Sequence, residues 1–227
     1  MERPTASPHT LEVPRTARWW SLLPSGNVPV RGTLFVLHGY GQLAEYFIRK
    51  FQRQADEGWN IVAPEGGHRF YLKGTSGRVG ASWMTKEERI SDIADHVRFL
   101  DLVRAQCPFS ESGPQVLLGF SQGVATALRW VSQGQSKPSE WSGLLAHSGV
   151  IPPDLSDTDS RFHSAPALQL ITGNADPYIR DAELRFQTAE SAWVQAGGQP
   201  DNMVQHAFEG GHDIDSDTVS CILNTIH

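Results

Sequence analysis

Three residues of this chain have the types and the order needed to activate a nucleophile: Ser121, Asp176 and His212. Ser121 is the centre of Gly119-Phe120-Ser121-Gln122-Gly123, which follows an apolar run and precedes a helix-like segment. A serine on such a strand-to-helix turn has a strained backbone and a freely projecting hydroxyl, and the flanking glycines avoid collisions with neighbouring backbone. We therefore interpret Ser121 as a nucleophile, which at neutral pH needs a base within hydrogen-bond reach.

His212 is the histidine best placed to be that base. The chain has nine histidines, but only His212 comes late, in the glycine-rich segment Glu209-Gly210-Gly211-His212-Asp213 before a C-terminal helical pattern. The unperturbed pKa of histidine is close to physiological pH, which suits a general base. We expect His212 to accept the proton of Ser121.

Asp176 has the context of an acid that orients the histidine. It lies in Gly173-Asn174-Ala175-Asp176-Pro177, where an apolar run ends in a turn. Such a carboxylate sets the tautomer of the histidine and stabilises its imidazolium, although Asp-Pro pairs are also common in ordinary turns. The competing acids are Asp181, expected within the next helix, Asp213, which cannot easily fold back onto the adjacent ring, and Asp215.

A glycine-rich turn upstream supplies a candidate oxyanion hole. His38-Gly39-Tyr40-Gly41 follows the apolar run 33–37, and its glycines allow close approach to a carbonyl group. We expect the backbone N–H groups of Tyr40 and Gln122 to form the hole, although a plain turn would have the same composition. The order of this turn, serine, aspartate and histidine is that of the α/β-hydrolases, not of the two main serine-protease folds.

The elements that must position these residues alternate between strand and helix from residue 33 onward. This pattern predicts an α/β fold of the α/β-hydrolase type, with a mostly parallel central sheet and helices on both faces. We expect a single domain over residues 9–227 after a disordered segment 1–8. The expected strands are 33–37, 60–63, 115–119, 143–147, 167–172 and 203–208, with further candidates at 11–13 and 17–22. The expected helices lie near 43–57, 86–106, 122–134, 179–196 and 214–226.

The helix at 86–106 has the clearest local signals. Thr85 and Glu88 have the spacing of a capping box, in which each side chain bonds the backbone of the other residue. Apolar residues then recur at helical spacing and predict one buried face. They are Ile90, Ile93, Ala94, Val97, Leu100 and Val103.

The segment 65–83 has no regular pattern and is rich in glycine. Long irregular loops in compact domains are often functional, and this one starts at the carboxyl end of a predicted strand, beside the expected site. We predict that Phe70, Tyr71 and Trp83 contact the substrate; the alternative is that these rings only pack the loop onto the domain.

The bulk composition excludes several classes of protein. At 227 residues with a net charge of −6, the chain lacks the basic excess that nucleic acids or anionic membranes attract. We find no signal-peptide or membrane-spanning pattern and expect no stable membrane insertion. The two cysteines are far apart and form no metal-like cluster, so we expect a reducing cytoplasm, no metal and no cofactor. The expected partner is a small-molecule ester, and a homodimer is compatible with the sequence.

These motifs together resemble the carboxylesterase/phospholipase family of small α/β-hydrolases, which includes acyl-protein thioesterases and bacterial carboxylesterases. The resemblance runs from about residue 33 to the C-terminus. It implies a triad of Ser121, Asp176 and His212, with Tyr40 and Gln122 at the oxyanion hole. The motifs that carry it are Leu37-His38-Gly39-Tyr40-Gly41, Gly119-Phe120-Ser121-Gln122-Gly123, Gly173-Asn174-Ala175-Asp176-Pro177 and Gly211-His212-Asp213-Ile214.

Two positions depart from that family's pattern. Gln42 stands where the family often has an aspartate, and Thr172-Gly173 stands where it usually has His-Gly. We expect a serine hydrolase that cleaves carboxylic esters of small to medium acyl chains through an acyl-enzyme. A lysophospholipase or acyl-protein thioesterase would use the same atoms. An inactive hydrolase fold that only binds a ligand, and a serine peptidase, are the remaining alternatives.

Overall fold

A computed structural model describes residues 6–108, 113–155, 161–178 and 182–226, without the side chains of 182–185. Its centre is a sheet in the order β1-β3-β2-β6-β7-β8-β9, in which β1 is antiparallel to β3 and the other neighbouring pairs are parallel. The strands are β1 (Trp19–Leu22), β2 (Gly32–Leu37), β3 (Trp59–Pro64), β6 (Gln115–Phe120), β7 (Gly143–His147), β8 (Leu168–Gly173) and β9 (Met203–Phe208). The predicted mostly parallel sheet is confirmed.

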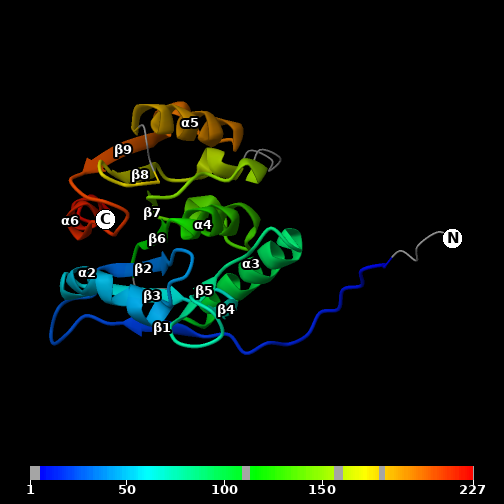
Figure 1. The fold of residues 1–227 in the computed structure, drawn as a ribbon. Helices are drawn as coiled ribbons and strands as arrows, with labels where there is room; N and C mark the ends of the chain where they lie inside the picture. Colours follow the sequence, from blue (N-terminus) through cyan, green and yellow to red (C-terminus); the bar gives the residue numbers. More distant parts are fainter. Residues whose placement is uncertain (1–5, 109–112, 156–160, 179–181, 227) are drawn as a thin grey trace.

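Helices cover both faces of this sheet. In Figure 1, α2 and α6 lie to the left of the strands and α3 and α4 to the right. The α-helices are α1 (Ala44–Phe47), α2 (Gln52–Asp56), α3 (Arg89–Gln106), α4 (Gln122–Gln133), α5 (Ala182–Gln195) and α6 (Ser216–Leu223). The short 3-10 helices are η1 (Ile48–Phe51), η2 (Pro138–Glu140), η3 (Pro153–Leu155), η4 (Arg161–Ser164) and η5 (Pro200–Asn202).

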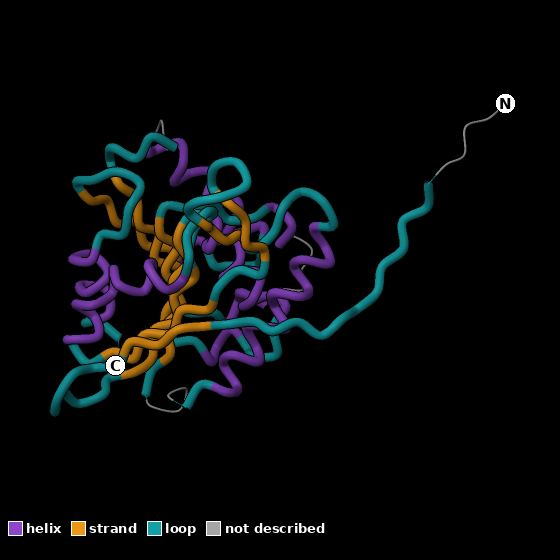
Figure 2. Tube along the Cα trace, turned by 60° about the horizontal axis from the view of Figure 1, so that its bottom comes forward, coloured by secondary structure: helices purple, strands orange, loops and turns teal. Residues whose placement is uncertain are grey.

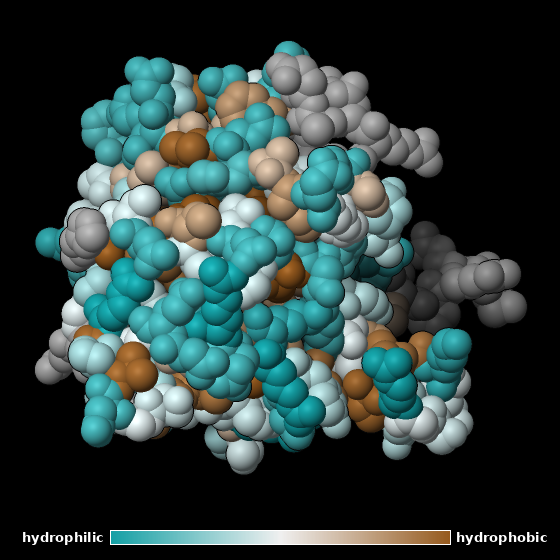
Figure 3. Space-filling view, turned by 90° about the vertical axis from the view of Figure 1, so that its left-hand side faces the viewer, coloured by the Kyte–Doolittle hydropathy of each residue, from teal (hydrophilic) through white to brown (hydrophobic). Residues whose placement is uncertain are grey.

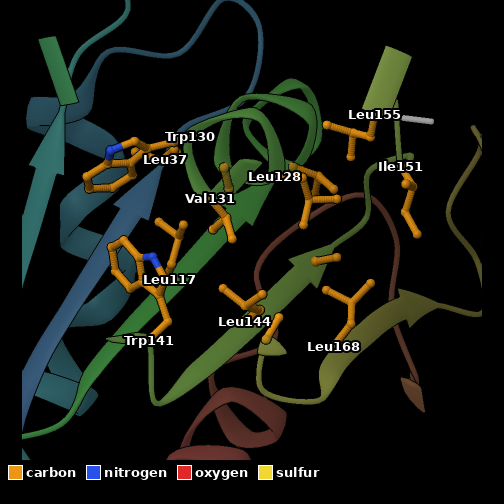
Figure 4. Close-up of a cluster of buried hydrophobic side chains, with 14 of the residues drawn as sticks. Leu37, Leu117, Leu128, Trp130, Val131, Trp141, Leu144, Ile151, Leu155 and Leu168 are labelled. Carbon is orange, nitrogen blue, oxygen red and sulfur yellow. The ribbon is translucent and has the colours of Figure 1, made fainter. Parts of the chain in front are cut away.

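Each face of the sheet has its own apolar core. One core joins α3, α4 and α5 to the sheet, and the other joins α1, η1, α2 and α6. Figure 4 shows Leu128 and Val131 of α4 above Leu117 of β6 and Leu144 of β7. Burying one such side chain stabilises the fold by roughly 1.5–3 kcal/mol. Figure 3 shows the α2 and α6 side from outside, where hydrophobic residues lie in separate spots among hydrophilic ones.

The N-terminal part of the chain differs from the prediction. Residues 6–18 have no regular secondary structure, so the expected strand at 11–13 is wrong, while the candidate at 17–22 forms β1. Figure 2 shows 6–18 as an extended segment leading away from the domain. A short apolar run pairs only where a strand edge is in reach, and β3 provides that edge from Trp19 onward. Residues 1–5 lie outside the described part, so the disorder of 1–8 stays a prediction.

One predicted helix is divided, and another is described only in part. The helix expected near 43–57 is divided into α1, η1 and α2. The helix expected at 179–196 is described from Ala182 to Gln195, and residues 179–181 lie outside the described part.

The predicted capping box before α3 is wrong. Thr85 Oγ1 accepts a hydrogen bond from the Glu87 amide at 3.2 Å, and Glu88 has a left-handed backbone with φ of 48°. α3 therefore begins only at Arg89. Ile90 is 75 % exposed, and the buried face begins at Ile93.

The sequence predicts an irregular segment at 65–83, and this prediction is wrong. The segment contains an antiparallel hairpin of β4 (His68–Tyr71) and β5 (Val79–Ser82). β5 also pairs with the turn after β2: the Gly41 amide donates to Ala81 O at 2.8 Å, and the Ala81 amide donates to Gln42 O at 3.1 Å. The small residues of β5 show no alternating apolar pattern, so neither this strand nor its pairing could be predicted from the local sequence.

Three histidines lie in the cores, away from solvent. They are His38, His96 and His147. Burial disfavours the charged imidazolium and lowers the pKa of each to about 4, from an ordinary value of 6.5. All three are therefore neutral in the folded protein near neutral pH.

We predict that these histidines make the fold sensitive to acid. Between about pH 6.5 and 4 the unfolded chain binds protons that the folded chain does not, so stability falls as the pH is lowered through this range. One such histidine accounts for at most roughly 3 kcal/mol. Urea unfolding at a series of pH values should show a smaller loss for His96→Gln than for the unmodified protein. The same change at exposed His9 should leave the loss as it was; equal losses in all three proteins would contradict the prediction.

Candidate active site

Ser121 lies between β6 and α4 in a strained conformation, with φ of 53° and ψ of −116°. The glycines on either side allow this turn to pack against backbone. A Cβ at Gly119 would lie 2.4 Å from Gly123 O, and a Cβ at Gly123 would lie 2.1 Å from Leu37 O. The Ser121 amide donates to His147 O at 2.9 Å, which ties the turn to β7. The turn thus has the geometry that its sequence predicted.

The structure brings Ser121, His212 and Asp176 together. Ser121 Oγ lies 3.0 Å from His212 Nε2, and His212 Nδ1 lies 2.7 Å from Asp176 Oδ2. Since a carboxylate only accepts, Nδ1 carries the proton and Nε2 is free to accept from the serine hydroxyl. The Asp176 side chain is fully buried, and its Oδ1 accepts the Tyr178 amide at 2.9 Å. The three groups form a continuous relay that ends at a hydroxyl.

Two aromatic rings hold the imidazole of His212. Phe120 and Tyr178 place their ring centroids 4.9 and 4.7 Å from it. The ring is 21 % exposed, so one edge still faces solvent. This packing restricts the rotation of the ring while leaving access for a substrate.

The competing carboxylates near His212 have other partners. Asp213 forms an ion pair with Lys50, with 2.6 Å between Oδ1 and Nζ, and the pKa of Asp213 is lowered despite partial burial because Lys50 donates to its carboxylate. Asp215 caps α6 by accepting the Thr218 amide at 2.9 Å. Asp181 lies outside the described residues. Within the described residues, Asp176 is the carboxylate on the His212 ring.

The turn that carries Tyr40 is closed by Gln42. The Gln42 amide donates to Gly39 O at 3.2 Å, and Gln42 Oε1 accepts the Gly39 amide at 2.8 Å. Tyr40 lies between them, and within the described residues its own amide has no hydrogen-bond acceptor. Gln122 is the first residue of α4, so its amide has no acceptor inside the helix. Both amides predicted for the oxyanion hole are therefore available to a ligand.

The Gln122 side chain binds the segment that follows β5. Its Oε1 accepts the Trp83 amide at 3.2 Å, and its Nε2 donates to Met84 O at 3.0 Å. Sequence reasoning considered only the backbone of Gln122 and noted Gln42 only as a departure. The partners of the Gln122 side chain could not be identified from sequence, because residues 83–84 are far away in the chain, whereas Gln42 bonds within its own turn.

Our prediction of a substrate contact for Trp83 is wrong. Its side chain is 1 % exposed, its indole N–H donates to His38 O at 2.9 Å, and its ring stacks on His38 with 5.0 Å between centroids. His38 in turn accepts the Gly66 amide on Nε2 at 2.9 Å. Trp83 therefore supports the turn that carries Tyr40 from the core side.

The other two aromatic candidates lie at the surface. Phe70 packs against the exposed ring of Tyr40, with 5.2 Å between centroids, and Tyr71 is exposed. Their contact with a substrate stays a prediction. A cavity of about 690 Å³ borders the turn that carries Tyr40, at Gly41 and Gln42, and lies between 43–50 and residues 77–79.

No group of three or more His, Cys, Asp or Glu side chains among the described residues could hold a metal ion. No helix in that part of the chain is long and apolar enough to cross a membrane.

Solved structures similar to this one include three hydrolases. Esterase PE8 is 23 % identical, with 94 % of this chain and 100 % of that chain covered and a TM-score of 0.65. Zea mays acyl-protein thioesterase 2 is 18 % identical, with 92 % and 97 % covered and a TM-score of 0.66. The Bacillus cereus carboxylesterase is 14 % identical, with 92 % of each chain covered and a TM-score of 0.60. At these identities the similarity shows the fold alone.

The family assignment comes from the sequence. A search of curated proteins gave no match. The family model described as Phospholipase/Carboxylesterase matches residues 22–227, which is most of the chain. The chain therefore belongs to the phospholipase/carboxylesterase family, and the α/β-hydrolase fold and the class of carboxylic-ester hydrolase that we predicted are confirmed.

Proposed function

We propose that this protein is a serine hydrolase that cleaves carboxylic esters of small to medium acyl chains through an acyl-enzyme on Ser121. The observation that carries the proposal is the relay of 3.0 Å from Ser121 Oγ to His212 Nε2 and 2.7 Å from His212 Nδ1 to Asp176. These distances are within the range that proton transfer between a nucleophile and its base requires.

In the first half-reaction, His212 Nε2 takes the hydroxyl proton as Ser121 Oγ attacks the ester carbonyl carbon. The carbonyl oxygen becomes an oxyanion, which accepts hydrogen bonds from the amides of Tyr40 and Gln122. Asp176 stabilises the imidazolium. The imidazolium then gives its Nε2 proton to the leaving oxygen, the bond between the acyl carbon and that oxygen breaks, and the alcohol departs.

In the second half-reaction, a water molecule replaces the alcohol. His212 Nε2 takes one proton of this water as its oxygen attacks the acyl carbon on Ser121. The same two amides hold the second oxyanion. The bond to Ser121 Oγ then breaks, Oγ recovers the proton from the imidazolium, and the carboxylic acid leaves.

Fixed donors make the oxyanion hole effective. Hydrogen-bond donors stabilise developing charge best when they need no reorganisation during the reaction. Gln42 closes the turn that carries Tyr40, β5 pairs with that turn at Gly41, and the Gln122 side chain attaches α4 to residues 83–84. Both amides are therefore held from more than one side.

A thioester or a lysophospholipid would react with the same atoms. The similar solved structures include both an esterase and an acyl-protein thioesterase, so the choice depends on the pockets that hold the acyl and leaving groups. Values of kcat/KM for an ester and a thioester with the same acyl chain would separate the two activities. A protein that only binds its ligand would give no turnover of a p-nitrophenyl ester.

We predict that a fluorophosphonate labels one residue, Ser121, as mass spectrometry of the labelled peptide can show. Ser121→Ala should lower kcat by several orders of magnitude while the protein still folds.

Asp176→Asn should lower kcat by about 10³–10⁴, because the histidine loses the acceptor that sets its tautomer. Asp213→Asn, which removes a carboxylate bound to Lys50 instead, is the matched control. Labelling at another residue, or a larger loss in the Asp213 variant, would contradict the assignment.

We predict that Gln42 contributes to kcat through the turn it closes. Gln42→Met keeps the length of the side chain but removes the oxygen that accepts the Gly39 amide, so kcat should fall about 10- to 100-fold with little change in KM. Gln42→Glu retains an acceptor, as does the aspartate frequent in the family, and should keep more activity than Gln42→Met. Steady-state kinetics of both variants test this, and equal kcat values for the two would disprove it.

We predict different effects for two aromatic residues of the hairpin region. Phe70→Ala should change the ratio of kcat/KM between acetyl, butyryl and octanoyl esters, since one methylene in an apolar pocket is worth about 1–3 kcal/mol. Trp83→Phe should lower the melting temperature and leave that ratio unchanged, because its ring lies in the core. If Phe70→Ala leaves the ratio unchanged, Phe70 packs the hairpin and does not contact the acyl chain.

A further inference from the structure

The end of β7 lies between the strands that lead to Ser121 and to Asp176, since the sheet order there is β6-β7-β8. His147 is its last residue. The carbonyl oxygen of His147 accepts the Ser121 amide at 2.9 Å, and the amide of the next residue, Ser148, donates to Ile171 O on β8 at 2.9 Å. The backbone of 147–148 therefore connects the nucleophile to the strand of the acid.

The side chain of His147 bonds the loop that carries His212, the third member of the triad. His147 Nε2 accepts the backbone amide of Asp215 at 3.0 Å. Asp215 follows His212 by three residues, and its carboxylate caps α6 at Thr218. The ring of His147 is thus hydrogen-bonded to Asp215, the residue that joins the His212 loop to α6.

The hydrogen bonds define the protonation state of His147. A backbone amide can only donate, so Nε2 must be unprotonated, and the proton lies on Nδ1, 3.1 Å from Ser148 Oγ. Burial lowers the pKa of His147 to about 4; Asp215, Asp213 and Asp176 oppose this shift, and His212 adds to it. His147 therefore stays a neutral acceptor throughout the neutral pH range.

The same ring packs against two aromatic residues, one of which, Phe120, also contacts the catalytic imidazole. Its centroid lies 5.7 Å from that of Phe120 and 5.4 Å from that of Phe208. Phe120 also contacts the His212 ring at 4.9 Å. The position of His212 therefore depends on His147 through the Asp215 amide on one side and through Phe120 on the other.

We infer that His147 is a positioning residue that keeps Nε2 of His212 within hydrogen-bond distance of Ser121 by accepting the Asp215 amide. The inference rests on the proposed function, because the position of His212 limits the rate only if His212 is the base. A displacement of about 1 Å in a catalytic group can cost about 100-fold in rate. The residue at position 147 must therefore provide a hydrogen-bond acceptor for the Asp215 amide, as His147 Nε2 does.

Two variants separate this role from packing. His147→Phe keeps a ring of similar shape but has no acceptor for the Asp215 amide, whereas His147→Gln places a carbonyl oxygen at a similar reach. We expect His147→Phe to lower kcat, and the rate of fluorophosphonate labelling, by about 10- to 100-fold with KM within about twofold. His147→Gln should restore most of both rates. Full activity in His147→Phe, or equal losses in the two folded variants, would overturn the inference.

Proton and nitrogen NMR of the protein test the geometry without relying on activity. In the unmodified protein, His147 should show an unprotonated Nε2, and the proton between His212 and Asp176 should give a strongly downfield resonance. That resonance should broaden or vanish in His147→Phe and return in His147→Gln. A protonated Nε2 on His147 in the unmodified protein would overturn the inference even if His147→Phe does not fold. A protein with these resonances but no labelling at Ser121 would instead disprove the proposed function.

Discussion

Direct packing of backbone against backbone around Ser121 is the constraint on which the rest of the site depends. The strained turn lies so close to its neighbours that a Cβ at Gly123 would meet Leu37 O and one at Gly149 would lie 2.4 Å from Ser121 O. The turn can lie there only because three parallel strands, β2, β6 and β7, end at the same edge of the sheet. The strain at Ser121 is therefore maintained by the sheet, whose cores on both faces keep those strand ends in place.

The turn that carries Tyr40 is held by three sets of contacts. Gln42 closes it from within, the hairpin strand β5 pairs with it at Gly41, and His38 and Trp83 pack beneath it. The contact of Gln42 is local, whereas β5 and Trp83 come from a later part of the chain. The hairpin is therefore part of the support of the site, and its half-buried Phe70 packs against the ring of Tyr40.

Two histidines near the site, His38 and His147, are kept neutral by burial. His38 and His147 each use one ring nitrogen to accept a backbone amide, which requires a neutral ring, and burial holds the pKa of both far below the ordinary value. His212 is partly exposed and faces a carboxylate on one side and a hydroxyl on the other. His38 and His147 thus support the site as neutral acceptors, while His212 is partly exposed and lies between a hydroxyl and a carboxylate.

The sequence by itself determined the parts of this protein that local patterns encode. Apolar runs predicted the central strands, because a strand buried on both faces must be apolar throughout. The glycines around Ser121 predicted the strained turn, and the order of Ser121, Asp176 and His212 predicted which residues meet at the carboxyl edge of the sheet. The match to the phospholipase/carboxylesterase family covers residues 22–227, which include all of these.

Only the tertiary structure decided the contacts between distant segments. The pairing of Ala81 with Gln42, the burial of Trp83 beneath His38, and the bond from Asp215 to His147 join residues that are far apart in sequence. Residues with no shared periodicity carry no local signal of such pairings. The start of α3 was mispredicted for a related reason: the spacing of Thr85 and Glu88 suits a cap, but Thr85 bonds the Glu87 amide instead. Which partner a polar group bonds depends on the groups that the folded chain brings within reach, and this is a property of the whole fold.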